Sequence, residues 1–211
     1  SHIPTDLSDP ADVELFIGEA LELLGDTPLN ALVNNAAVSP KTDFQERLGC
    51  LNGPIDDWRE VFQLNFFTPL VLARGFAPAL AKAGKDEDAE ATEASGTEGG
   101  ASIVNITSIA GHAIHPFAGS AYSTSKAALS ALTREMAVEF AALGVRVNAV
   151  APGEIETEMV GDEYEPLVNR IPMHRMGTAG EVASTVFQLC NPDFSYVTGT
   201  EIFVTGGQHL Y

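Results

Sequence analysis

The sequence has 211 residues, 45% hydrophobic and 19% charged, which is the length and composition of one globular domain. Its formal net charge of -18 argues against binding to nucleic acid or an anionic membrane, because both need lysine and arginine patches. We find no secretory signal and no apolar run of about 18 residues, and Cys50 and Cys190 lack metal-ligand spacing. These features predict a cytoplasmic protein with reduced thiols and no metal site.

Apolar periodicity predicts helices and strands that alternate along the chain. Helices are expected at 10–24, 54–83, 121–142 and 178–192, and strands at 30–36, 101–108, 145–153 and 200–207. Pro69 and Pro78 are expected to kink or interrupt the second helix, and Thr178 with Glu181 predicts a capping box at the start of the last one. Continuous apolar strands between helices are typical of a doubly wound parallel sheet with both faces covered.

Residues 82–100, KAGKDEDAEATEASGTEGG, depart from this pattern. The stretch is made of small and charged side chains that cannot build a core. It is interpreted as an acidic low-complexity surface insertion within a single domain spanning residues 1–211.

Polar and turn-forming residues follow three of the predicted strands. They are the sequences NNAA (34–37), TS (107–108) and APGEIET (151–157). In an open parallel sheet, ligands bind beyond the carboxyl ends of the strands, so this edge is where a functional site is expected.

Tyr122 and Lys126 open the helix that follows the second of these strand ends. Residues four apart on a helix lie on the same face, about 6 Å from each other. Such spacing by itself more often indicates an ordinary pair on the helix surface. A nearby ammonium group would also lower the pKa of a tyrosine from its usual value near 10, making Tyr122 a general acid in reduction and a base in oxidation.

Seven segments, taken in order, resemble the short-chain dehydrogenase/reductase family over essentially the whole chain. The segments are DLSD (6–9), NNAA (34–37), Asn65, Ser108, YSTSK (122–126), APGEIET (151–157) and SYVTGTEIFVTGG (195–207). The nearest members are bacterial 3-oxoacyl-carrier-protein reductases, sugar dehydrogenases and carbonyl reductases. The resemblance implies a Rossmann-type fold and NAD- or NADP-dependent interconversion of a small-molecule carbonyl and a secondary alcohol.

The resemblance also implies a role for each matching residue. Tyr122 would transfer the proton, Lys126 would bind the nicotinamide ribose, Ser108 would hold the substrate oxygen, and Asn65 would anchor a water that links Lys126 to solvent. The simpler interpretations are a helix cap for Ser108 and a buried amide for Asn65. The residues expected to bind the cofactor are Asp6, Leu7, Asn35, Ala36, Tyr122, Lys126, Pro152, Gly153, Ile155 and Thr157. A homodimer or homotetramer is implied too, assembled through helices 54–83 and 121–142 and the last strand.

One family element has no counterpart in this sequence. The turn Thr-Gly-x-x-x-Gly-x-Gly, which presents N–H groups to the cofactor diphosphate, does not occur. The chain starts where the family completes its third strand, so the first two strand–helix units are expected to be missing and strand 30–36 to have an apolar open edge. Two interpretations stay open: a segment of an ordinary enzyme, favoured by the complete catalytic set, or a non-catalytic remnant that folds by pairing with another chain.

Overall fold

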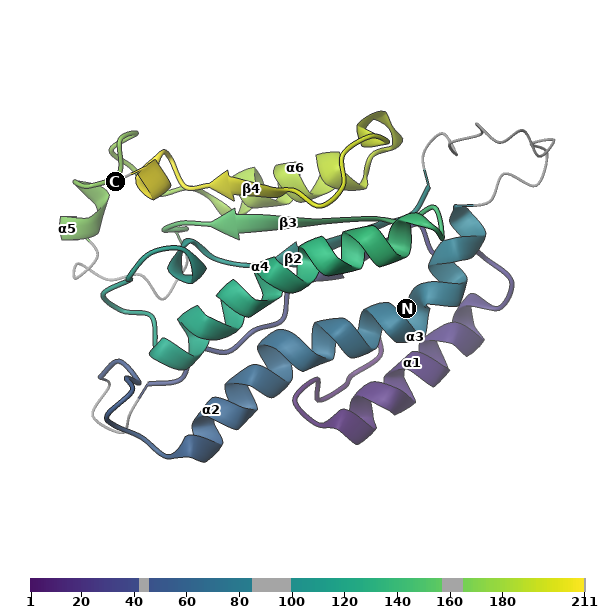
Figure 1. The fold of residues 1–211 in the computed structure, drawn as a ribbon, viewed down its shortest axis with the longest axis horizontal. Coiled ribbons are helices and arrows are strands. Elements are labelled where there is room, and N and C mark those ends of the chain that lie inside the picture. Colours follow the sequence, from purple (N-terminus) through teal and green to yellow (C-terminus); the bar gives the residue numbers. More distant parts are fainter. Residues whose placement is uncertain (42–45, 85–99, 157–164, 211) are drawn as a thin grey trace.

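A four-stranded parallel sheet forms the centre of the protein (Figure 1). The computed structural model describes residues 1–41, 46–84, 100–156 and 165–210. The strands, in spatial as well as chain order, are β1 (Ala31–Asn34), β2 (Ser102–Ile106), β3 (Arg146–Pro152) and β4 (Glu201–Val204). All three pairings are parallel, so the predicted sheet is confirmed, although each strand is shorter than its apolar run.

The predicted helices are confirmed to within two residues at each end. The helices are α1 (Pro10–Leu24), α2 (Ile55–Phe62), α3 (Thr68–Ala83), α4 (Ser120–Ala141), the short α5 (Glu165–Val168) and α6 (Ala179–Cys190). Three-residue 3₁₀ turns cover Ile109–Gly111, Pro192–Phe194 and Gln208–Leu210. The capping box of Thr178 and Glu181 is present at the start of α6, and α5 was not predicted.

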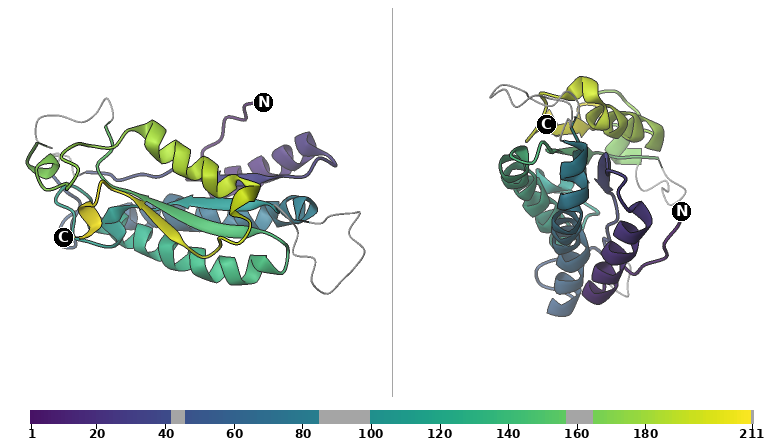
Figure 2. Two further views of the ribbon diagram at one scale, coloured as in Figure 1. Left: turned by 90° about the horizontal axis from the view of Figure 1, so that it is seen from above. Right: turned by 90° about the vertical axis from the view of Figure 1, so that its right-hand side faces the viewer.

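Helices lie on both faces of the sheet (Figure 2). On one face, Leu72 and Phe76 of α3 pack against Ile103 and Val147 of the sheet, and α1 joins this core through an edge-on contact of Phe16 with Phe76. On the other face, α6 contributes a second core in which Leu189 packs with Val104 and Val150. These two apolar clusters fix the sheet between its helices.

Helices α2 and α3 form one unbroken helical segment, Ile55–Ala83, that contains a π-helical turn at Gln63–Phe67. The turn stands directly before Pro69, which lacks the N–H that an α-helix would use there. The Thr68 hydroxyl donates to the carbonyl of Gln63 at 3.0 Å and to that of Leu7 at 2.8 Å. Neither proline therefore interrupts the helix: the hydrogen bonding changes to a π-helical turn before Pro69, and α3 continues through Pro78.

The same segment, Ile55–Ala83, is the one helix among the described residues that is long and apolar enough to cross a membrane. It contains no uninterrupted apolar run of about 18 residues, so the sequence alone did not single it out. Leu72, Phe76 and Leu80 face the core, so packing against the sheet accounts for this composition.

Strand β1 pairs with β2 on one side only, and its other edge has no partner among the described residues. Val33 on this strand is 43% exposed, in agreement with the expected apolar edge. A buried polar chain ties β1 to its neighbours: the Asn34 amide donates to Asn105 at 2.8 Å, and the Asn105 amide donates to Thr133 at 2.9 Å.

Most of the predicted acidic insertion lies outside the described residues, which include only Lys82, Ala83, Gly84 and Gly100 of it. The residues at its two ends, Gly84 and Gly100, pack closely against the turn after α4. A Cβ on Gly84 would lie 2.6 Å from the Leu143 carbonyl oxygen, and a Cβ on Gly100 would lie 2.1 Å from the Gly144 carbonyl oxygen.

Candidate active site

Tyr122 and Lys126 lie on the first turns of α4, beside the carboxyl end of β2. The Lys126 ammonium group is 5.7 Å from the centre of the Tyr122 ring and donates a hydrogen bond of 2.6 Å to the Ile106 carbonyl. Lys126 is only 2% exposed and forms no ion pair with a carboxylate in the described part of the chain. A buried cation without a counter-ion is costly, so its retention points to a ligand that uses it.

Burial sets the pKa values of both side chains. It lowers the pKa of Lys126 to about 8, because the ammonium form loses its hydration. It raises the pKa of Tyr122, and hydrogen bonding by the Ser108 side chain offsets this only in part. The expectation of a lowered pKa for Tyr122 is therefore wrong for the protein by itself, since removal of the phenolate from water outweighs the hydrogen bond with Ser108.

Ser108 directly follows β2 and acts as the cap of the 3₁₀ turn after it, where its hydroxyl accepts a hydrogen bond of 3.1 Å from the N–H of Ala110. The cap interpretation is thus confirmed. It leaves the hydroxyl proton of Ser108 available to a substrate oxygen, because a hydroxyl both donates and accepts. Ser108 and Tyr122 are brought together as the sequence predicted.

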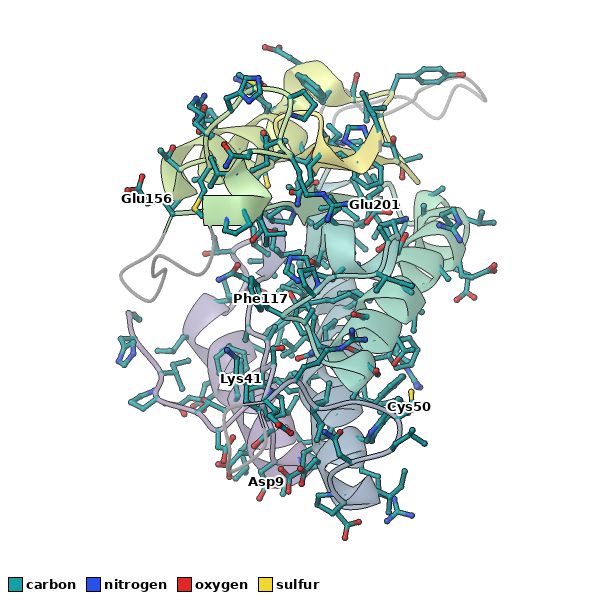
Figure 3. All side chains as sticks on the ribbon, turned by 90° about the vertical axis from the view of Figure 1, so that its left-hand side faces the viewer. Asp9, Lys41, Cys50, Phe117, Glu156 and Glu201 are labelled. Atoms are coloured by element: carbon teal, nitrogen blue, oxygen red, sulfur yellow. The ribbon has the colours of Figure 1, made fainter. Side chains whose placement is uncertain are left out.

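Glu201 is a residue of this region that sequence reasoning missed. Its carboxylate, at the start of β4, accepts hydrogen bonds from Thr107 and from Ser130 and lies 3.0 Å from His112 Nε2. It therefore connects the edge strand to the residue before Ser108 and to α4. Figure 3 shows Glu201 beside α4. The sequence feature that could have indicated it is an acidic residue at the start of an otherwise apolar strand.

Gly111 marks the closest approach of the segment after Ser108 to α4. A Cβ at Gly111 would lie 2.8 Å from the Ala127 nitrogen and 3.0 Å from the Lys126 carbonyl carbon, both of them backbone atoms. We expect Gly111→Ala to destabilise the fold by about 1–3 kcal/mol in urea denaturation, because the helix backbone cannot yield locally.

Gly18 is the matched control for this prediction. No neighbouring atom lies within 4 Å of a Cβ placed there, inside α1, so Gly18→Ala should stabilise by about 0.5–1 kcal/mol. A Gly111→Ala variant as stable as the wild type would show that the contact is not tight.

Asn65 lies within the π-helical turn and is fully buried. Its side chain accepts from the N–H of Val38 at 2.9 Å and donates to the Val38 carbonyl at 3.0 Å and to the Ser125 hydroxyl at 3.1 Å. Ser125 in turn donates to the Tyr122 carbonyl at 2.8 Å. The buried-amide interpretation is confirmed, and since both amide hydrogens are used, the side chain fixes α4 against the loop after β1.

Strand β3 ends at Pro152, and the loop after it carries Gly153 and Ile155 along the same edge of the sheet. Gly153 donates to the Val204 carbonyl at 3.0 Å, and a Cβ there would lie 3.1 Å from the Thr205 Cα, so glycine is required for packing against β4. Ile155 pairs with Gly177 in an isolated bridge. Thr157 lies outside the described residues.

The residues expected at the adenosine end divide into two groups. Leu7, Asn35 and Ala36 line one cavity of about 150 Å³ beside β1, together with the buried Asn34, whose Oδ1 has no hydrogen-bond partner. Asp6 is exposed and accepts from the N–H and hydroxyl of Ser8, which lowers the pKa of its carboxyl group. Asp6 is not among the residues that line the cavity.

No group of three or more histidine, cysteine, aspartate or glutamate residues that could hold a metal occurs in the described ranges. Cys50 and Cys190 are both free thiols.

Comparison with known proteins identifies the family. The sequence family described as Enoyl-(Acyl carrier protein) reductase matches residues 1–209. Protein FixR of Bradyrhizobium diazoefficiens is 48% identical over 210 residues, which cover 99% of this chain and 70% of FixR. An oxidoreductase from Brucella ovis titled as a short-chain dehydrogenase/reductase, solved with a partially ordered NAD, is 45% identical with a TM-score of 0.75, covering 96% of this chain and 78% of that one. The chain belongs to the short-chain dehydrogenase/reductase family.

A further family structure carries the other nicotinamide cofactor. ElxO with NADP bound is 27% identical with a TM-score of 0.81, over all of this chain and 79% of that one. The expected family and α/β fold class are confirmed, and the family's cofactor is NAD or NADP, with both found among the neighbours.

Proposed function

We propose that this protein is an oxidoreductase that interconverts a small-molecule carbonyl compound and a secondary alcohol, with Tyr122 as the general acid and base. The observation that carries the proposal is the buried Lys126 ammonium group, which has no carboxylate partner among the described residues and lies next to Tyr122 and the hydroxyl of Ser108. A purely structural helix surface would not bury this cation.

The described residues fit a nicotinamide cofactor at its ribose end. Lys126 has donors left after its bond to the Ile106 carbonyl, and ribose hydroxyls can accept them. Pro152, Gly153 and Ile155 bring backbone close to the same edge of the sheet, and Thr157 would follow them. Leu7, Asn35 and Ala36 would line the adenosine side, with Asp6 next to them in sequence.

When bound, NAD or NADP supplies or accepts the hydride at the carbon atom of the substrate. The chain's own residues handle the proton and the position. In reduction, the Tyr122 hydroxyl donates its proton to the substrate oxygen, which the Ser108 hydroxyl orients by a hydrogen bond. In oxidation, the Tyr122 phenolate takes that proton back. The raised pKa of Tyr122 keeps it protonated at neutral pH, which favours the acid role there.

Asn65 would support this chemistry from behind the site. Its hydrogen bonds to Val38 and Ser125 hold the first turns of α4 in place. Because both amide hydrogens are used, a water that links Lys126 to solvent would have to bind the backbone of the π-helical turn, where the widened turn frees carbonyl groups.

The expected test result is that NADH or NADPH raises the melting temperature. A ligand at 100 times its Kd stabilises the native state by about 2.7 kcal/mol, which is about 5–10 °C for a chain of this size. Turnover with a panel of simple ketones and secondary alcohols then follows by absorbance of the reduced cofactor. If neither cofactor form shifts the melting temperature, this function is lost for the chain as given.

The alternative function is a non-catalytic protein that folds by pairing the open edge of β1 with another chain. The unpaired edge favours it, as does the lack of a glycine-rich turn that opens a helix in the described ranges. Absence of any cofactor shift, together with concentration-dependent assembly in size-exclusion chromatography, would support this alternative.

We further propose that residues 1–211 form a single domain, with 82–100 as a surface insertion, and that the protein is cytoplasmic. We also propose that it assembles as a homodimer or homotetramer, with the segments 55–83 and 120–141 and β4 at the interfaces. Mass determination by light scattering tests the assembly. A monomer across micromolar concentrations would contradict it.

A further inference from the structure

The carboxylate of Glu154 is buried in the loop that carries the expected nicotinamide contacts. Glu154 stands between Gly153 and Ile155 and is 8% exposed. A buried carboxylate normally has a cationic partner, since removal of a charge from water is costly. The partners of Glu154 therefore decide what charge this loop presents.

The first partner, His115, uses one of its ring nitrogens as a hydrogen-bond acceptor. Its Nδ1 accepts hydrogen bonds from the N–H groups of Phe117 at 3.2 Å and Ala118 at 3.1 Å, so Nδ1 carries no proton. The single ring proton must then be on Nε2, which lies 2.6 Å from Glu154 Oε1 and donates to it. The contact is thus a hydrogen bond from a neutral imidazole to a carboxylate, and it does not cancel the charge.

The second partner, Gln208, is also neutral, and its Nε2 lies 3.3 Å from Glu154 Oε1. In the described part of the chain, Glu154 forms no ion pair with lysine or arginine. Arg170 lines a cavity of about 70 Å³ with His115 and Gln208 but does not contact the carboxylate. Lys126 is bonded to the Ile106 carbonyl. Among the described residues, the carboxylate of Glu154 is thus hydrogen bonded by His115 and Gln208 and by no lysine or arginine.

We propose that the uncompensated carboxylate of Glu154 makes the nicotinamide site prefer the oxidised, cationic form of the cofactor over the reduced, neutral form. The inference rests on the proposed function. A unit charge acts strongly on a neighbouring cationic ring where water is largely excluded, and it leaves a neutral ring almost unaffected. The same charge disfavours substrates with an anionic group close to the reacting carbon, so the substrate is a neutral alcohol or carbonyl compound.

The decisive variant is Glu154→Gln, which keeps an acceptor for His115 and removes the charge. The measured quantity is the ratio of the Kd for the reduced cofactor to the Kd for the oxidised cofactor, by titration calorimetry with NAD⁺ and NADH, or NADP⁺ and NADPH. We expect Glu154→Gln to lower this ratio about tenfold.

Glu156→Gln is the matched control, because Glu156 lies two residues further on and points away from the protein in Figure 3. Solvent screens the charge of Glu156, so Glu156→Gln should change the ratio of the two Kd values by less than about twofold. Equal ratios in wild type and Glu154→Gln would overturn the inference alone. Failure of the wild type to bind either form would overturn the proposed function, and this inference with it.

A second measurement needs no cofactor. In ¹⁵N NMR of the histidine rings, with the His115 signals assigned by their loss in His115→Gln, we expect the tautomer with the proton on Nε2 and none on Nδ1. A doubly protonated His115 at pH 7 would compensate Glu154 and overturn the inference whatever the binding ratios are.

Discussion

Replacement of Tyr122 by phenylalanine should lower turnover by at least about 100-fold in both directions, because it removes the proton that the reaction transfers. The ring and its packing on α4 remain, and the Lys126 ammonium group keeps its bond to the Ile106 carbonyl. The affinity for NAD or NADP should therefore change little. Steady-state kinetics together with the Kd of the cofactor separate these two effects.

Tyr196→Phe is the matched control, because Tyr196 is fully exposed and the same atom is removed. It should leave turnover and affinity as they are. Activity of Tyr122→Phe within about tenfold of the wild type would remove Tyr122 from the acid–base role.

Lys126→Met should abolish most turnover and yet make the protein more stable at pH 7. The native pKa of Lys126 is about 8, below its ordinary value of 10.5, so folding disfavours the protonated form. A shift of this size corresponds to about 3 kcal/mol, less about 1 kcal/mol for the lost hydrogen bond to Ile106. The variant should therefore melt about 4–8 °C higher at pH 7.

The sign of this effect fixes its dependence on pH. The cost of the buried ammonium group is fully present below pH 8, where Lys126 is protonated in both the native and the unfolded state. It falls as pH rises from about 8 to 10.5, where the unfolded chain still binds the proton and the native one does not. The gain in melting temperature of Lys126→Met over wild type should therefore shrink above pH 8 and disappear before pH 10.5, because the loss of the hydrogen bond to Ile106 remains at every pH.

Lys82→Met provides the comparison, because Lys82 is half-exposed and its ion-pair partner among the described residues is the exposed Asp26. It should show no gain at pH 7. A Lys126→Met variant less stable than wild type at pH 7 would show that the lysine has a counter-charge in the native protein.

The placement of a candidate residue could be predicted from sequence where it depends on position along one element. Tyr122 and Lys126 share a face because helical spacing places them there, and Ser108 follows a strand whose apolar run marks its end. The predicted lowering of the Tyr122 pKa was wrong, because the shift depends on burial of the phenol by residues distant in sequence. Glu201 and the His115–Glu154 pair were not predicted as partners, since their hydrogen bonds join segments 39 to 94 residues apart.

The sequence by itself determined the alternation of strands and helices, the parallel sheet and the family, because apolar periodicity and ordered short motifs are local properties of the chain. Only the tertiary structure decided which charges are compensated. In the part of the chain that the structure describes, Lys126 forms no ion pair with a carboxylate and Glu154 forms none with lysine or arginine, and neither fact can be read from neighbours in sequence. Burial and hydrogen bonding depend on elements that meet only in the folded chain, and they set the electrostatics of the site.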